Sequence, residues 1–135
     1  MAILGLDVGE RRIGVALADR LLAIPLTVID RAGQGADLER ILTLAKEHGA
    51  ERIVVGLPRS LDGSIGRQAE RVFTFSKALS ESTDVPVDTW DERLSTVAAE
   101  RLLLDAGVKR GKRRAQRDAM AAAIILQAYL DRISR

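Results

Sequence analysis

A chain of 135 residues has room for one domain, and a content of 47% hydrophobic and 30% charged residues is typical of a soluble globular protein. The lack of cysteine excludes a disulfide framework, a zinc–thiolate site and a cysteine nucleophile. We expect a single cytoplasmic domain over 1–135, because we find neither a signal peptide nor an apolar run long enough to span a membrane. The net charge of +2 is too small to indicate a nucleic-acid partner by itself.

The first thirty residues predict an antiparallel meander. Residues 3–8 have the pattern of a buried strand, and residues 12–18 form a second strand after a tight turn at 9–11. A third strand is expected at 26–29, beginning after Pro25.

The rest of the chain alternates helical and strand patterns. In chain order we predict a helix at 36–48, a strand at 53–55, a helix at 68–79, a strand at 85–90, a helix capped by Ser95 or Thr96 that ends near 105, and a last helix at 118–133. A meander followed by β–α units predicts an α/β fold with a mixed sheet and helices on both faces.

Asp7 lies in an otherwise apolar strand, between Gly5 and Gly9. A lone charge at such a place costs several kcal/mol of desolvation unless a positive charge meets it, and the flanking glycines allow a ligand to come close. Either a bound metal ion or an ion pair with a neighbour such as Arg11 or Arg12 would supply that positive charge.

Further acids stand at element ends. Asp91 and Glu92 follow a strand at its carboxyl end, where α/β sheets place their sites, and only one of the two is expected to face Asp7 because adjacent strand residues point to opposite sides. Asp118 begins the last predicted helix, where it either caps the helix or joins the site. Three such acids suit Mg²⁺ or Mn²⁺, and two such ions could activate water and stabilise the leaving oxygen in phosphodiester hydrolysis. His48, the only histidine, is interpreted as a helix-end or surface residue.

Two segments are candidates for contacts with phosphate. The loop at 56–64 follows a strand and precedes a helix, so its amides could hold a phosphate at the helix N-terminus, although an ordinary connection explains it equally well. The candidate residues of this loop are Gly56, Arg59, Ser60, Gly63 and Ser64. The segment 109–117 contains no acid and indicates either a nucleic-acid contact or a solvated linker. Its basic residues are Lys109, Arg110, Lys112, Arg113, Arg114 and Arg117.

Several motifs, in order along almost the whole chain, resemble those of the YqgF family, whose members are also called RuvX, Holliday junction resolvases or pre-16S ribosomal RNA nucleases. The motifs are Gly5-Leu6-Asp7-Val8-Gly9 with Arg12-Ile13-Gly14-Val15-Ala16, Val54-Val55-Gly56-Leu57-Pro58, Asp62-Gly63-Ser64, Gln68-Ala69, Trp90-Asp91-Glu92-Arg93-Leu94-Ser95-Thr96 and Ala122-Ala123-Ile124-Ile125-Leu126-Gln127.

The resemblance implies an RNase H-like fold related to the RuvC resolvases, with a central five-stranded mixed sheet and helices on both faces. It also implies a nuclease that depends on Mg²⁺ or Mn²⁺, in which Asp7, Glu92 and Asp118 are catalytic residues and metal ligands, with Asp91 as a neighbouring candidate ligand. Glu92 is preferred to Asp91 because a RuvC-type site has a glutamate at that place. Ala121 stands where RuvC-type sites have a second helix aspartate.

The hypothesis that follows is an endonuclease that hydrolyses phosphodiester bonds of structured nucleic acid. Its substrate would be either the 5′ end of precursor 16S rRNA or a Holliday junction, cut by a monomer or a homodimer. Basic residues of 109–117 would add sequence-independent affinity for phosphates. Two other classes stay open: a non-catalytic nucleic-acid-binding module in transcription or ribosome assembly, and an ATP-dependent phosphotransferase of the actin-like type, which the pattern Gly5 to Gly9 also resembles.

Overall fold

The protein is described by a computed structural model that covers residues 2–19, 21–58, 66–92, 97–108 and 113–133. The strands in these ranges are β1 (Ala2–Val8), β2 (Arg12–Ala18), β3 (Ala23–Asp30), β4 (Ala50–Leu57) and β5 (Val87–Asp91). The helices are α1 (Gln34–Glu47), α2 (Arg67–Glu81), α3 (Val97–Asp105) and α4 (Arg114–Ile133). This element order is the one that the apolar patterns predict.

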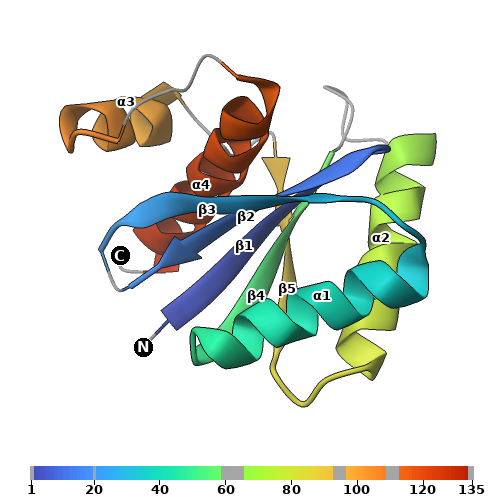
Figure 1. The fold of residues 1–135 in the computed structure, drawn as a ribbon. Coiled ribbons are helices and arrows are strands. Elements are labelled where there is room, and N and C mark those ends of the chain that lie inside the picture. Colours follow the sequence, from blue (N-terminus) through green and yellow to red (C-terminus); the bar gives the residue numbers. More distant parts are fainter. Residues whose placement is uncertain (1, 20, 59–65, 93–96, 109–112, 134–135) are drawn as a thin grey trace.

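The five strands form one mixed sheet in the order β3-β2-β1-β4-β5. The pairs β1–β2 and β2–β3 are antiparallel, whereas β1–β4 and β4–β5 are parallel. Helices α1 and α2 cover one face of the sheet, and α4, with α3 beside it, covers the other (Figure 1). The predicted mixed sheet with helices on both faces is therefore confirmed, and the carboxyl ends of β1, β4 and β5 lie at the same edge.

Alternate residues of the strands supply two hydrophobic cores. On β1, the fully buried side chains of Leu4 and Leu6 pack in the core beneath α1 and α2, whereas Ile3 packs in the core beneath α4. On β4, Val55 faces the first core and Val54 the second. Because a strand points successive side chains to opposite faces, this alternation also decides which face of the sheet each polar residue of a strand occupies.

Several boundaries differ from the prediction by a few residues, and two of them, the starts of β3 and α4, affect the sheet edge and the site. β3 begins at Ala23 and contains Pro25, which is tolerated because β3 is an edge strand bonded only to β2, so the missing N–H of Pro25 leaves no second ladder incomplete. α4 begins at Arg114, four residues before the predicted start at 118, because nothing in the polar stretch 114–117 opposes helix. Asp118 is therefore not the first residue of the helix.

None of the helices within the described ranges is long and apolar enough to cross a membrane.

Candidate active site

Asp7 lies near the carboxyl end of β1, half-buried on the sheet face that α4 covers. Its position follows from the alternation of β1, since Leu6 and Val8 on either side of it belong to the core beneath α1 and α2. In the ladder with β2, Asp7 stands opposite Gly14. The side chain thus enters the space between the sheet and α4, where no second side chain from β2 competes with it.

Two glycines allow α4 to lie directly on the sheet. A Cβ atom on Gly14 would lie 2.0 Å from the backbone carbonyl oxygen of Asp118, and a Cβ atom on Gly5 would lie 2.8 Å from Cβ of Leu126. Real atoms do not approach so closely, so only glycine fits either position. The close approach brings the second turn of α4, and with it Asp118, against β2 next to Asp7.

Glu92 follows the last residue of β5 and also reaches the α4 side of the sheet. Trp90, two residues earlier, packs in the core beneath α4, so alternation directs Asp91 to the other face, as predicted for one of the two acids. Gly56 lies opposite Trp90 in the β4–β5 ladder, and a Cβ atom there would lie 3.0 Å from Oε1 of Glu92. Gly56 therefore belongs to β4 and makes room for Glu92. The strand ends one residue later, at Leu57, and the predicted phosphate contact of Gly56 stays a prediction.

Asp7 and Glu92 are hydrogen-bonded to each other through their side chains. The pKa of Glu92 is raised from 4.5 to about 7, chiefly by burial and next by the negative charge of Asp7. The pKa of Asp7 is also raised, first by burial and then by the negative charge of Asp118, although its bond to Glu92 opposes the rise. Near neutral pH the pair is therefore still partly protonated, because two ionised carboxylates in contact repel each other.

Asp118 is paired with Arg12, whose Nε donates to Oδ2 of Asp118 at 2.8 Å, with both side chains about one-third exposed. Arg12 thus pairs with Asp118. The alternative in which Arg12 supplies the positive charge next to Asp7 would have required an Arg12–Asp7 pair instead. Asp7, Arg12 and Asp118 line one cavity of about 270 Å³, together with Gly9, Glu10 and Arg11. Within the described ranges no three His, Cys, Asp or Glu side chains are already arranged around a point that could hold a metal ion. Asp7 and Glu92 are in direct contact, and Asp118 lies nearby, paired with Arg12.

The other predicted site residues are distributed as follows. Arg113, Arg114 and Arg117 are exposed at the beginning of α4. His48 is exposed at the C-terminal end of α1, as interpreted. Outside the described residues lie Arg59, Ser60, Gly63 and Ser64 of the loop, and Lys109, Arg110 and Lys112 of the basic stretch.

Three residues of the site were not singled out from the sequence for the roles they have here: Arg12, Gly14 and Gly56. A glycine inside a strand often marks a close backbone approach, so Gly14 and Gly56 carried a usable signal. Arg12 carried none, because its partner Asp118 is 106 positions away along the chain.

The raised pKa values predict how the stability of the metal-free protein depends on pH. A group whose pKa is higher in the folded than in the unfolded state stabilises the fold at low pH, and this contribution is lost as pH rises. For Glu92 the loss falls between about 4.5 and about 7. We expect the melting temperature in EDTA to fall across this window, and Glu92→Gln to remove much of the fall, as measured by circular dichroism. A melting temperature of the wild type that rises through this window would contradict the assignment.

Comparisons with known proteins agree with the fold. The family model described as "RuvX: Holliday junction resolvase" matches residues 1–132. A protein of Desulforamulus reducens named "Putative pre-16S rRNA nuclease" is 50% identical over 97% of both chains, and one of Symbiobacterium thermophilum with the same name is 51% identical over 97% of this chain and 92% of its own. Among solved structures, Thermus thermophilus RuvC in complex with a Holliday junction substrate superposes with a TM-score of 0.67, at 18% identity over 99% of this chain and 96% of that one, which shows the shared fold. The chain belongs to the RuvX family and has the RNase H-like fold of the RuvC resolvases.

Proposed function

We propose that this protein is a metal-dependent endonuclease that hydrolyses phosphodiester bonds of structured nucleic acid. The observation that carries the proposal is the contact between Asp7 and Glu92 beside Asp118, at the carboxyl edge of the sheet. Acids from β1, the end of β5 and α4 gather here although the charge of Asp118 raises the pKa of Asp7 and the charge of Asp7 raises the pKa of Glu92. Carboxylates that are kept in mutual repulsion are the expected ground state of a cation site.

The donor set fits a hard divalent cation. Asp7 and Glu92 offer carboxylate oxygens, and Asp118 can add another if its bond to Arg12 is exchanged, which is inexpensive for a pair that is about one-third exposed. Asp7, Glu92 and Asp118 would hold Mg²⁺ or Mn²⁺, with Asp91 as a neighbouring acid. Such an ion supplies positive charge to the phosphate and activates the attacking water.

The residues around the acids have roles of their own. The cavity of about 270 Å³ is open to the solvent side of the acids and is lined by Arg11 and Arg12. A guanidinium group donates two parallel hydrogen bonds to a phosphate, so Arg12 can orient the scissile phosphate as that phosphate replaces Asp118 as its partner. The exposed Arg113, Arg114 and Arg117 at the start of α4 would contact phosphates farther along the substrate.

Precursor 16S rRNA is the first candidate substrate, because relatives that are about half identical over nearly the whole chain carry that name. A four-way DNA junction is the second, because the family model and the RuvC complex refer to it. Both substrates present phosphates on a structured backbone, which is what the carboxylates and arginines of this site can recognise. Either a monomer or a homodimer is compatible with RNA trimming, whereas symmetric cutting of a junction favours a dimer with two sites.

Cleavage assays test the proposal directly. We expect the purified protein to cut a 5′-labelled precursor 16S rRNA fragment, a four-way DNA junction or both in Mg²⁺ or Mn²⁺, and to cut neither in EDTA. Cleavage that continues undiminished in EDTA would refute metal dependence. Binding without cleavage in any divalent metal would favour the non-catalytic binding module instead.

A further inference from the structure

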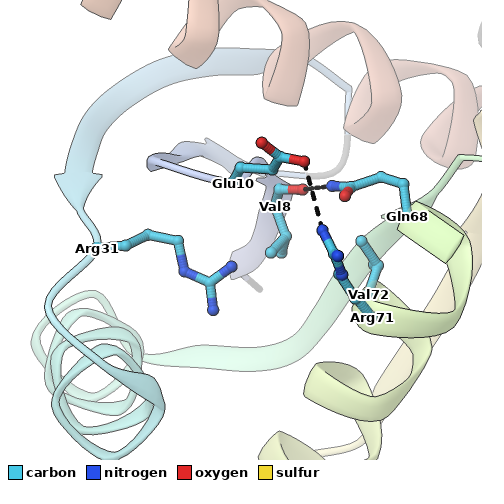
Figure 2. A pocket seen from close by; sticks show the side chains of 6 residues that line it. All are labelled: Val8, Glu10, Arg31, Gln68, Arg71 and Val72. Atoms are coloured by element: carbon cyan, nitrogen blue, oxygen red, sulfur yellow. Dashed lines mark hydrogen bonds and ion pairs between the residues drawn. The ribbon is translucent and has the colours of Figure 1, made fainter.

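A second polar cavity opens on the opposite face of the sheet from the acids. Its volume is about 500 Å³, and it is lined by Val8, Glu10, Arg31, Gln68, Arg71 and Val72, which come from the end of β1, the end of β3 and the first turns of α2 (Figure 2). We call it the arginine pocket. A neighbouring hollow of about 450 Å³ shares Arg31 and Arg71 with it and adds Arg67. Cavities of this size accommodate a nucleotide or a similar small group.

Arg31 is held rigidly at the wall of the arginine pocket. Its Nε donates to Oδ2 of Asp37 at 3.1 Å, one of its terminal amino groups donates to the carbonyl oxygen of Gly9 at 3.0 Å, and its guanidinium carbon lies 5.2 Å from the centre of the Phe75 ring. Asp37 is 1% exposed, so this pairing is buried on the carboxylate side. An arginine that is already ordered loses little further entropy when it binds a phosphate.

Arg71 is held only loosely. It pairs with Glu10 at 3.4 Å, and the two side chains are 64% and 73% exposed (Figure 2). Exposed pairs of this kind contribute at most about 1 kcal/mol, so a phosphate can displace Glu10 at low cost. Arg67 stands one helical turn earlier on α2, which places two exchangeable guanidinium groups on one side of that helix.

The arginine pocket and the acidic cavity share a lining residue. Glu10 lines both of them, and Val8 of the arginine pocket is the residue directly after Asp7. Gln68 fixes this junction, because its amide donates to the carbonyl oxygen of Val8 at 3.2 Å and so ties α2 to the end of β1 (Figure 2). A nucleic-acid strand that lays one phosphate on the acids can therefore pass over the edge of the sheet into the arginine pocket.

We propose that the arginine pocket and the hollow beside it form a second phosphate-binding subsite, in which Arg67 and Arg71 hold a backbone phosphate of the substrate strand beside the scissile position while Arg31 forms the fixed wall. This inference rests on the proposed nuclease function. The exposed arginines of α4 lie on the opposite face of the sheet, so the substrate straddles the carboxyl edge and is held from both faces (Figure 1). When no substrate is bound, Glu10 is paired with Arg71. Small anions that cannot displace Glu10 from Arg71 would then bind poorly.

The test measures the affinity of the Asp7→Asn protein, which should bind without cutting, for a fluorescein-labelled four-way DNA junction and a precursor 16S rRNA hairpin at several salt concentrations. Arg67→Gln and Arg71→Gln are each expected to weaken binding of the substrate about 3- to 10-fold and to reduce the salt slope by about one. Arg40→Gln, at an exposed position of α1 outside both hollows, is the matched control and should change affinity less than about twofold.

A second pair of variants separates a local contact from a general charge effect. Glu10→Gln should tighten binding of the substrate severalfold more than Glu47→Gln, which removes the same charge at the exposed end of α1. The additional gain in affinity of Glu10→Gln over Glu47→Gln should vanish when Arg71→Gln is also present, because the ion pair between Glu10 and Arg71 is then already lost.

The outcomes are distinguishable. If Arg67→Gln and Arg71→Gln match Arg40→Gln in affinity and salt slope while the wild type still cuts nucleic acid, the arginine pocket is not a subsite and the nuclease proposal stands. If the wild type binds and never cuts, the nuclease proposal fails on its own. If it binds neither probe, both proposals are overturned.

Discussion

Asp7→Asn is expected to lower the cleavage rate at least about 10³-fold, because a metal site supplies several kcal/mol of charge stabilisation in the transition state and each 1.36 kcal/mol corresponds to a factor of ten. The amide has the shape of the carboxylate and can keep the hydrogen bond to Glu92, but it loses the charge that draws in a cation. Removing that charge also removes repulsion from Glu92 and Asp118, so the variant should be at least as stable as the wild type at pH 8. The measurement is a single-turnover cleavage rate together with a melting curve.

Asp84→Asn is the matched control for this experiment. Asp84 is exposed and precedes β5, so it lies at the opposite end of that strand from Glu92. The same chemical change there should leave the cleavage rate within about twofold of the wild type, as for a surface substitution away from the site. If Asp7→Asn behaved like Asp84→Asn, the assignment of the acidic site would be rejected.

Gly14→Ala is expected to have the second large effect, on the fold and the site together. The new methyl group would lie 2.0 Å from the carbonyl oxygen of Asp118 and 2.6 Å from its carbonyl carbon. Those atoms belong to the backbone of a helix packed on the sheet, so the overlap cannot be relieved by turning a side chain. We expect a loss of about 3 kcal/mol or more in the free energy of unfolding, at the upper end of the range for overpacked cores. Any protein that still folds should have Asp118 displaced from Asp7 and should cut poorly.

Gly35→Ala gives the contrasting result for the same chemical change. A Cβ atom at Gly35 meets nothing within 4 Å, and the residue lies in the first turn of α1 with no positive φ. Alanine there should leave stability unchanged or raise it by about 0.4–1 kcal/mol. Urea unfolding of both variants measures the difference, and a Gly14→Ala protein as stable as Gly35→Ala would show that α4 does not rest on β2 as described.

Local sequence pattern alone predicts the order of the strands and helices and part of the candidate site. The alternation of apolar residues in β1 and β4 and the helical spacing in α1, α2 and α4 predict the element order, because both periods follow from backbone geometry alone. The same alternation separates Asp91 from Glu92. An aspartate between apolar neighbours at position 7 marks a candidate site because its desolvation cost requires a reason.

Tertiary structure alone decided how the acids are used. Asp118, at the predicted helix start, could be a cap or a ligand, and only the close approach of α4 to Gly14 shows that it joins Asp7 and pairs with Arg12. The role of Gly56 beside Glu92 depends on the register of β4 with β5. The arginine pocket likewise joins β1, β3 and α2, whose residues are far apart in the chain. Such contacts depend on how separate elements pack, and burial and electrostatic effects are set by that packing, whereas a sequence pattern reports only neighbours along the backbone.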